Sequence, residues 1–218
     1  MRGRIYGEGH LADVLRCELE LWAGYSEDGL GQDVLGFVAE DITDHEPAQL
    51  GAALRAFERA RAHHRTVVVL SQVPPGWMRS VVKNRAWAYY QVDTIIVRSA
   101  VERMMRPEQI IVGCADPSAP LSLEYQSYLA LHSCPVLQMT YESAELAKCG
   151  VNYVLAKQIE AANELARAAG ACGADYAQVM RALRGDSRIG SCAYLRPGGT
   201  NQHLDRDVAT ICKVLEKD

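Results

Sequence analysis

The sequence predicts an α/β protein in which a shortened parallel sheet over residues 1–138 is followed by an all-helical domain over residues 139–218. The first observation is an alternation of short apolar runs with amphipathic stretches, which is typical of a parallel sheet covered by helices. The second is the stretch from Glu142 to Ala169, which lacks proline and is rich in Ala, Leu, Glu, Lys and Gln. These residues are good helix formers, so the stretch predicts one long central helix.

Composition excludes several classes of protein. The 218 residues carry a net charge of −4, and their basic residues are scattered among acidic ones, so we expect no nucleic-acid partner. No apolar run approaches the ~20 residues that span a membrane, and no apolar signal-peptide core opens the chain. The seven cysteines lack C-x-x-C spacing, which indicates free thiols and a cytoplasmic protein. The six histidines lack metal-ligand spacing, so we expect no metal site.

The chain opens with an expected strand and a glycine turn. Residues 2–6 form the strand, and the pattern G-x-G-x-x-A follows at Gly7, Gly9 and Ala12. A glycine turn that leads into a helix offers backbone N–H groups to a pyrophosphate. The pattern is typical of a Rossmann-like nucleotide-binding unit, and it equally fits an ordinary tight turn.

One element of such a unit is missing. A second strand should end in Asp or Glu about 20 residues after the glycines, where the acid binds a ribose. Instead, residues 24–32 are polar and rich in glycine, and the next apolar run is 33–39. We infer that a strand–helix–strand portion has been lost. Alternatively, Glu40 or Asp41 is the ribose acid, although it lies far from the glycines along the chain.

The remaining elements of the sheet domain alternate along the chain. Continuous apolar runs predict buried parallel strands, and amphipathic stretches predict helices. The expected strands cover residues 66–71, 92–97, 109–112 and 135–139, and the expected helices cover residues 10–22, 49–63, 76–86 and 121–132. In the second domain we expect the central helix and a shorter helix over residues 175–183.

The central helix carries three polar residues on one face. Glu145, Lys148 and Asn152 lie at positions i, i+3 and i+7 of the expected helix. A cation and an amide one turn apart can hold and polarise an oxygen atom of a substrate. A solvated helix face fits the same spacing.

Short sequence blocks follow one another around this helix. From the helix onward they are Ala144-Glu145-Leu146 with Lys148 and Asn152, Asn163-Glu164, Gly173-Ala174-Asp175 and Asp186-Ser187-Arg188-Ile189-Gly190; upstream lie Val73-Pro74-Pro75-Gly76 and Pro107-Glu108-Gln109-Ile110-Ile111-Val112-Gly113. In this order the blocks resemble the UDP-glucose/GDP-mannose dehydrogenase family. The resemblance is strong over residues 66–190 and thin before them.

The resemblance implies an oxidoreductase that transfers hydride from a sugar-type alcohol to a nicotinamide cofactor. It implies catalytic roles for Lys148, Asn152 and Asp207. It also implies that Glu145 contacts the substrate, a small molecule of the nucleotide-sugar type. Arg188 would reach the nucleotide sugar of a neighbouring subunit.

The resemblance further implies contacts with the cofactor. Val73 and Pro74 would border it together with the glycine turn. Asp93 stands for a family glutamate that works in acid–base steps. NAD is the expected cofactor, with weak or lost binding because the ribose acid is missing; the sequence does not distinguish it from NADP.

The nucleophile of the family is the main departure. A cysteine thiolate attacks the aldehyde formed by the first oxidation and allows a second oxidation at the same site. Counting back from Arg206 and Asp207, His203 occupies the place of that cysteine, and an imidazole cannot form the thioester. We therefore expect an impaired or single-step enzyme. The sequence ends at Asp218, where the family continues into a third domain, so we expect a shortened member of the family.

Three functions follow from these observations. The first is the impaired, NAD-dependent dehydrogenase-like oxidoreductase. The second is a catalytically inactive relative that acts as a dimeric scaffold or a regulatory partner. The third is a small-nucleotide binder that uses only the glycine turn. We expect a homodimer through the central helix, because that helix is apolar on more than one side.

Overall fold

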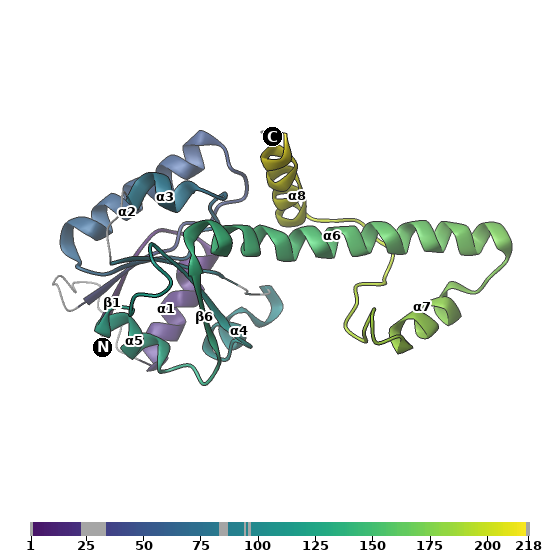
Figure 1. Cartoon of the computed structure of the whole chain (residues 1–218), viewed down its shortest axis with the longest axis horizontal. Coiled ribbons are helices and arrows are strands. Elements are labelled where there is room, and N and C mark those ends of the chain that lie inside the picture. Colours follow the sequence, from purple (N-terminus) through teal and green to yellow (C-terminus); the bar gives the residue numbers. More distant parts are fainter. Residues whose placement is uncertain (1, 23–33, 83–86, 94, 96, 217–218) are drawn as a thin grey trace. The chain divides into compact units, whose positions relative to one another are not determined.

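The structure is a computed structural model, and it describes residues 2–22, 34–82, 87–93, 95 and 97–216. The chain divides into two compact units, Met1–Lys148 and Cys149–Asp218. The first unit contains the expected sheet domain together with the first turns of the long helix, and Figure 1 shows its helices on both faces of the sheet.

The described residues of the first unit form a sheet of six strands. Their bounds are β1 (Arg2–Tyr6), β2 (Val34–Val38), β3 (Val67–Val69), β4 (Ala88–Gln91), β5 (Ile110–Cys114) and β6 (Val136–Thr140). The order across the sheet is β1-β2-β3-β4-β5-β6, and all neighbours run parallel except β4 and β5.

This strand order agrees with a shortened nucleotide-binding sheet. In the usual Rossmann order, 3-2-1-4-5-6, the first strand has neighbours on both sides. Here β1 lies at the edge of the described sheet and pairs only with β2, in the register Arg2↔Val34 to Tyr6↔Val38. The antiparallel pairing of β4 with β5 is a difference from the all-parallel sheet that the sequence suggests.

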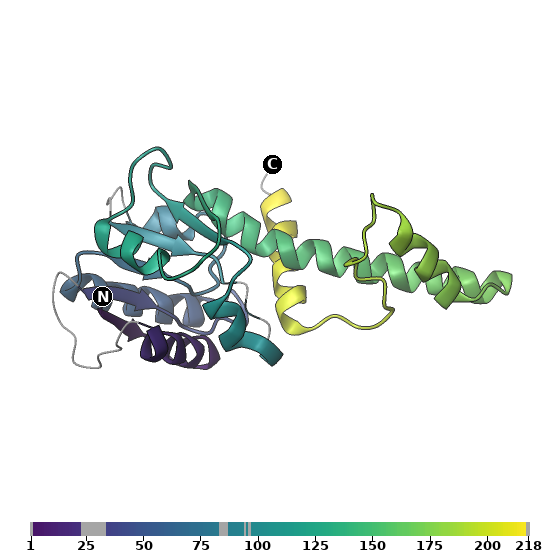
Figure 2. The same ribbon diagram turned by 90° about the horizontal axis from the view of Figure 1, so that it is seen from below.

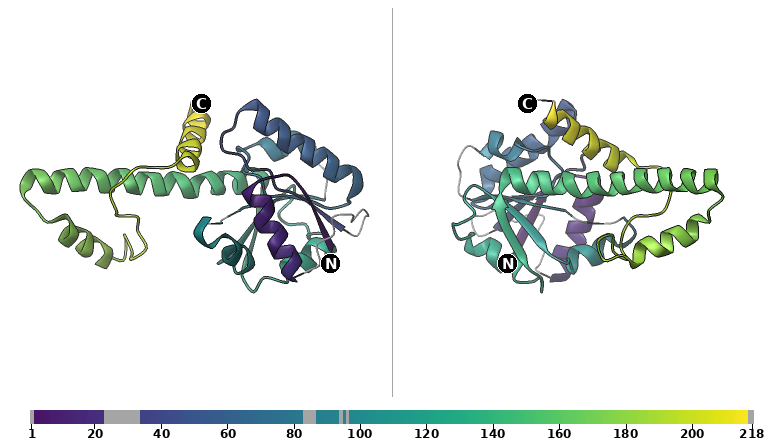
Figure 3. Two further views of the ribbon diagram at one scale, coloured as in Figure 1. Left: turned by 180° about the vertical axis from the view of Figure 1, so that it is seen from behind. Right: turned by 45° about the vertical axis from the view of Figure 1, so that its right-hand side comes forward.

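The helices of the first unit cover both faces of the sheet. They are α1 (His10–Trp22), α2 (Pro47–His63), α3 (Trp77–Val82), the short 3₁₀ helix η1 (Val97–Ser99), α4 (Ala100–Met105), α5 (Leu123–Leu129) and the start of α6 (Tyr141–Cys172). One hydrophobic cluster joins α1, α4 and α5 to one face of the strands, and a second joins α2, α3 and the start of α6 to the other. Figures 2 and 3 show the α1 face from two further directions.

Alternate residues of β2 and β3 belong to these two clusters. Phe37 and Val68 point to the α1 face, whereas Val38 and Val69 point to the α2 face. Both clusters are fully buried at these positions. This two-sided burial explains why the strands appear in the sequence as continuous apolar runs.

Two expected elements of the first unit need correction. The strand expected at residues 92–97 lies earlier, at Ala88–Gln91, because Ala88 pairs with Val67 and the chain leaves the sheet before Asp93. The helix expected at residues 76–86 is described only as Trp77–Val82, and its remainder lies outside the described residues. The polar stretch at residues 24–32 also lies outside them.

The second unit is helical. It contains the remainder of α6, then α7 (Tyr176–Gly185) and α8 (Gln202–Leu215). The side chain of Asp175 caps α7 by accepting a hydrogen bond from the Ala177 N–H, and Asn201 caps α8 through the N–H groups of His203 and Leu204. The sequence predicts only the central helix and the helix at residues 175–183 in this domain, so α8 is an additional element.

All seven cysteines are free thiols. Among the described residues, no helix has the length and apolar character needed to cross a lipid bilayer, and no group of three or more His, Cys, Asp or Glu side chains could bind a metal ion.

A buried carboxylate ties α1 to α5 inside the first unit. Glu18 of α1 is 1% exposed. Its carboxylate lies 2.6 Å from Nε2 of His132 and accepts a hydrogen bond of 3.0 Å from the Tyr128 hydroxyl. Because a buried carboxylate is costly unless it is paired, these contacts fix the position of α1 on the sheet.

Replacing Glu18 by Ala should therefore destabilise the protein. The change leaves the buried His132 ring and the Tyr128 hydroxyl without their shared acceptor, and we expect the free energy of unfolding to fall by about 3 kcal/mol. Denaturant unfolding followed by circular dichroism measures this change. Glu20→Ala, on the exposed side of the same helix, is the matched control and should change stability little. Equal stability of the two variants would contradict the prediction.

Candidate functional site

The candidate site of the first unit lies at the carboxyl ends of β1 to β4. These strands are mutually parallel, so the segments that follow them emerge at the same edge of the sheet. The segments carry the glycine turn after β1, Glu40 and Asp41 after β2, Gln72 after β3 and Asp93 after β4. This edge is where ligands bind in open parallel sheets.

The glycine turn has the backbone conformation that the motif predicts. Gly7 and Gly9 have φ values of 141° and 99°, which side-chain-bearing residues rarely adopt. A Cβ atom on Gly7 would overlap with the backbone of Ala39, at the end of β2. Ala12 is fully buried where α1 packs on the sheet. The turn therefore requires glycine because it packs closely against β2.

The N-terminus of α1 is capped by a carboxylate of the same chain. Oδ2 of Asp41 accepts a hydrogen bond of 2.5 Å from the His10 N–H, and Oδ1 accepts one of 3.0 Å from the Leu11 N–H. The carboxylate also lies against Gly9, where a Cβ atom would overlap with it. Next to it, Oε2 of Glu40 lies 3.4 Å from the Glu8 backbone N.

These contacts test whether a nicotinamide dinucleotide fits the turn. Its pyrophosphate would need the N–H groups at the start of α1, and those groups already bind Asp41. The Glu40 and Asp41 carboxylates also bring like charge next to the turn. The residues present therefore do not fit the cofactor that the motif implies. The role expected for Gly7, Gly9 and Ala12 stays a prediction.

A second polar cluster joins the ends of β3 and β4 to α6. Lys148 is 8% exposed, and its ammonium group donates a hydrogen bond to the Asp93 carbonyl and lies 3.6 Å from the Asp93 carboxylate. That carboxylate also accepts a hydrogen bond of 3.1 Å from the Gln72 amide. Oε1 of Gln72 is buried and has no hydrogen-bond partner among the described residues. The structure thus brings together Lys148 and Asp93, two of the expected catalytic residues.

Glu145 lies one turn before Lys148 on α6 and binds the turn after β3. Its fully buried carboxylate accepts hydrogen bonds of 2.6 Å from the Gly76 N–H and 2.7 Å from the Met78 N–H. These N–H groups belong to the start of α3 and to the turn that contains Val73 and Pro74. Val73 is buried and Pro74 is half-buried. Glu145 therefore holds this turn in place from inside the fold, and its expected contact with a substrate stays a prediction.

The environment of Glu145 changes its titration. Burial raises the pKa of its carboxyl group from 4.5 to about 7, although the hydrogen bonds from Met78 and Gly76 act in the opposite direction. A carboxyl group with a raised pKa in the folded state stabilises the protein below its unfolded-state pKa. That contribution is lost as the pH rises through the pKa of the folded state.

We therefore expect Glu145→Gln to alter the pH dependence of stability. Between pH 4.5 and 7, the wild-type protein should lose up to about 3 kcal/mol of unfolding free energy relative to the variant, because one pKa unit corresponds to about 1.36 kcal/mol. Denaturant unfolding of both proteins across this range measures the difference. Glu142→Gln is the control with the opposite sign, since its hydrogen bonds with Arg79 lower the pKa of Glu142. Parallel pH profiles for Glu145→Gln and the wild type would refute the prediction.

The second unit contains its own polar cluster. The Asn152 amide donates a hydrogen bond of 2.6 Å to Oδ2 of Asp207, which is fully buried. Arg206 donates to both oxygens of the same carboxylate, at 2.7 Å and 2.9 Å. The structure thus joins Asn152 to Asp207, and Arg206 is a third member of this cluster.

The glycine-rich segment before α8 is fixed to α6. The Asn163 side chain donates a hydrogen bond to the Gly198 carbonyl and accepts one from the Gly198 N–H, each 2.9 Å long. His203 follows as the second residue of α8 and is half-buried. A groove of about 520 Å³ lies beside this segment, between α6 and α8.

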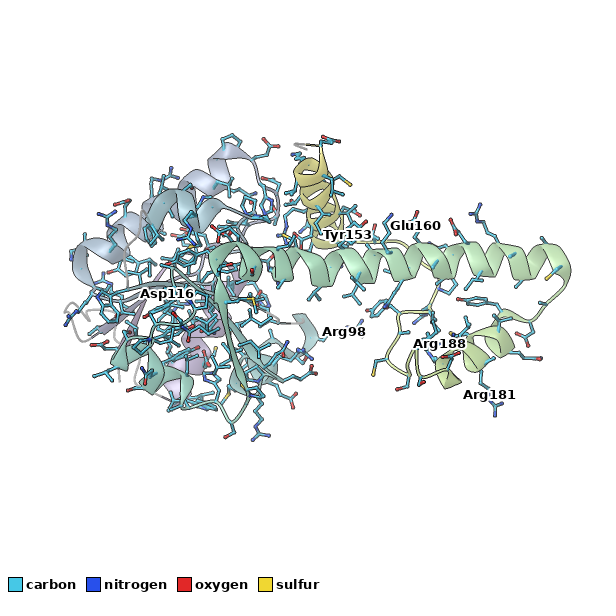
Figure 4. The ribbon with its side chains drawn as sticks, in the orientation of Figure 1. Arg98, Asp116, Tyr153, Glu160, Arg181 and Arg188 are labelled. Carbon is cyan, nitrogen blue, oxygen red and sulfur yellow. The ribbon has the colours of Figure 1, made fainter. Side chains whose placement is uncertain are left out.

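Arg188 lies after α7, where Figure 4 labels it. Its guanidinium group forms two hydrogen bonds with the Asp186 carboxylate, of 3.0 Å and 2.7 Å. Its side chain is 86% exposed, so it is accessible to a second molecule. Its expected role toward a neighbouring subunit stays a prediction.

Two local signals could have revealed features that the sequence analysis missed. Asn201 is a preferred helix cap, and the apolar residues after it recur at helical spacing, which indicates α8. Arg206 next to Asp207 is a candidate ion pair from sequence alone. No sequence signal identifies Asp41 as the cap of α1, since the contact depends on the pairing of β1 with β2.

Comparison with known proteins adds to this geometry. Residues 142–217 match the model of the UDP-glucose/GDP-mannose dehydrogenase family, central domain. UDP-glucose 6-dehydrogenase of Pseudomonas aeruginosa is 36% identical over 122 residues, which cover 55% of this chain and 27% of that protein. GDP-mannose 6-dehydrogenase of Azotobacter vinelandii is 27% identical over 210 residues, which cover 90% of this chain and 46% of that protein. The chain thus spans less than half the length of these relatives.

Solved structures show the same fold. A UDP-glucose dehydrogenase from Pyrobaculum islandicum superposes with a TM-score of 0.78 at 22% identity, over 99% of this chain and 64% of that chain. A UDP-D-ManNAc dehydrogenase from Pyrococcus horikoshii superposes with a TM-score of 0.78 at 13% identity, over 100% of this chain and 65% of that chain. At these identities the likeness establishes the fold alone.

Fold, polar clusters and relatives together define the class of the protein. The Rossmann-like sheet followed by a helical unit with a Lys–Asn-bearing helix is the fold seen in solved nucleotide-sugar dehydrogenases. The chain belongs to the UDP-glucose/GDP-mannose dehydrogenase family.

Proposed function

We propose that this chain is a nucleotide-sugar dehydrogenase-like protein that acts as a homodimeric scaffold and does not carry out a complete sugar oxidation. The observation that carries the proposal is an apolar stripe on α6. Val151, Val154 and Leu165 are 51%, 53% and 40% exposed. Ala161 is exposed between them. Their spacings of three, seven and four residues place all four on one side of the helix.

The pattern of the stripe favours a second copy of this chain as its partner. The stripe is nearly symmetric about Gln158, with Val151 and Leu165 at its ends and Val154 and Ala161 inside. An antiparallel copy of the same helix would therefore bring each apolar residue against another. A twofold interface needs this self-complementarity, because the same surface serves both partners.

The neighbouring helix supports the same conclusion. α7 has no fully buried residue, although Val179, Met180 and Leu183 form an apolar side. These three side chains are half-buried in one chain. A second copy would remove further apolar surface from water, at roughly 25 cal/mol per Å².

The absence of the family's nucleophile supports the non-catalytic part of the proposal. His203 stands at the place of the cysteine by sequence count, and its imidazole cannot form a thioester intermediate. Arg206 forms an ion pair with Asp207, and Lys148 forms an ion pair with Asp93. The polar residues that the family uses thus serve to hold this fold together.

The dimer has a direct test by light scattering. We expect a mass of about 48 kDa, twice the chain mass of 24.0 kDa. Val154→Glu introduces a charge into the centre of the stripe and should shift the mass to that of one chain. Leu21→Glu, at an exposed apolar position on α1 (65%), is the matched control and should leave the mass unchanged. A single-chain mass for the wild-type protein at micromolar concentration would refute the dimer.

A second candidate function is a single oxidation of a sugar-type alcohol. The buried pair of Lys148 and Asp93 favours it, because an ammonium group held beside a carboxylate can polarise a substrate oxygen. Arg188, which is exposed, would then bind the nucleotide sugar of a neighbouring subunit. UDP-glucose and GDP-mannose are the substrates to try first, since the relatives are named for them.

An assay separates the two functions. Purified protein with NAD and UDP-glucose should form no UDP-glucuronate, and His203→Cys should not restore its formation, because the cofactor does not fit the glycine turn. Product analysis by mass spectrometry is the measurement. A two-electron product from the wild-type protein would establish the single-step enzyme, and a four-electron product would refute both candidates.

A further inference from the structure

The glycine turn of this chain is still built as a phosphate-binding turn. In such turns the first glycine allows the tight bend and the second allows the ligand's pyrophosphate to approach the backbone. The third small residue allows the helix to pack on the strand. Gly7 makes the bend, with φ at 141°, and Ala12 is fully buried against the sheet. The second glycine, Gly9, differs from the usual pattern in the group that approaches it.

The group that approaches the second glycine is a side chain of the protein. A Cβ atom on Gly9 would overlap with the carboxylate of Asp41, so this carboxylate occupies the space beside the glycine. The same carboxylate accepts hydrogen bonds from the His10 and Leu11 N–H groups, at 2.5 Å and 3.0 Å. These are donors at the start of a helix, where the dipole favours an anion.

We propose that the Asp41 carboxylate takes the place of a dinucleotide's pyrophosphate at the N-terminus of α1 and thereby keeps the turn from binding nicotinamide dinucleotides. The protein thus carries its own anion in this site. The proposal concerns only the turn and does not depend on the scaffold function proposed above.

The backbone around Asp41 keeps the carboxylate in this position. The Ala39 N–H donates to the Tyr6 carbonyl at 3.0 Å, and the Asp41 N–H donates to the Glu8 carbonyl at 3.4 Å. The segment after β2 is thus hydrogen-bonded to the segment after β1. A ligand that displaced the side chain would leave the carboxylate next to its own phosphates.

Neighbouring charges act in the same direction. Oε2 of Glu40 lies 3.4 Å from the Glu8 backbone N, in the same turn as the contact. A bound pyrophosphate would therefore meet carboxylates as well as lose its hydrogen-bond donors. Like charges at short range disfavour binding.

The test removes the internal anion and measures the binding of an external one. Inorganic pyrophosphate and NAD are titrated by calorimetry into the wild-type protein, Asp41→Ala and Asp44→Ala. We expect no binding of either ligand to the wild type at millimolar concentration. Asp41→Ala should bind pyrophosphate at least tenfold more tightly than the millimolar limit set by the wild type, which corresponds to a difference of about 1.4 kcal/mol or more. Asp44, in the same segment, bonds to Gln49 and Glu46 instead, so its variant is the matched control.

Each outcome decides the proposal. Tighter binding by Asp41→Ala alone supports it. Unchanged binding by Asp41→Ala, an equal gain by Asp44→Ala, or micromolar binding of NAD by the wild type overturns it. If the alanine variant fails to fold, Asp41→Asn retains an acceptor for the helix and removes the charge, and it should give a smaller gain. The dimer is tested separately by light scattering. A single-chain mass would refute the scaffold function and would not affect the outcome of the pyrophosphate titration.

Discussion

The structure of the first unit depends on the direct pairing of β1 with β2. This register places the segment after Val38 beside the glycine turn that follows Tyr6. The close approach of Gly7 to Ala39 and the cap that Asp41 provides for α1 are both consequences of that pairing. A sheet with another strand order would separate the two segments. The order of the strands therefore determines which side chains meet at the carboxyl ends of β1 and β2.

Much of the fold could be predicted from local sequence. The run at residues 66–71 and the stretch from Glu142 to Ala169 were identified correctly because one is continuously apolar and the other is rich in helix formers. Local sequence predicts the fourth strand too late, at residues 92–97, because those residues are more apolar than Ala88–Gln91. Only the register with Val67 decides between the two positions. Local propensity does not contain that information.

The candidate site was less predictable than the fold. Helical spacing correctly put Glu145, Lys148 and Asn152 on α6, yet their partners lie on segments far away in the sequence. Glu145 binds the turn at Gly76, and Lys148 binds Asp93. A sequence motif specifies which groups are present. Whether those groups face a ligand or one another depends on tertiary contacts, which in this chain satisfy most of them internally.

The close packing of Gly7 on Ala39 has a consequence for the history of the protein. Substitution there is penalised by steric overlap and by a backbone angle that only glycine adopts easily, whether or not any ligand binds. A descendant could therefore keep its glycine fingerprint long after natural selection for a cofactor had ended. The glycines of such a motif persist because the turn needs them for packing. Their presence therefore does not indicate how recently an activity was lost.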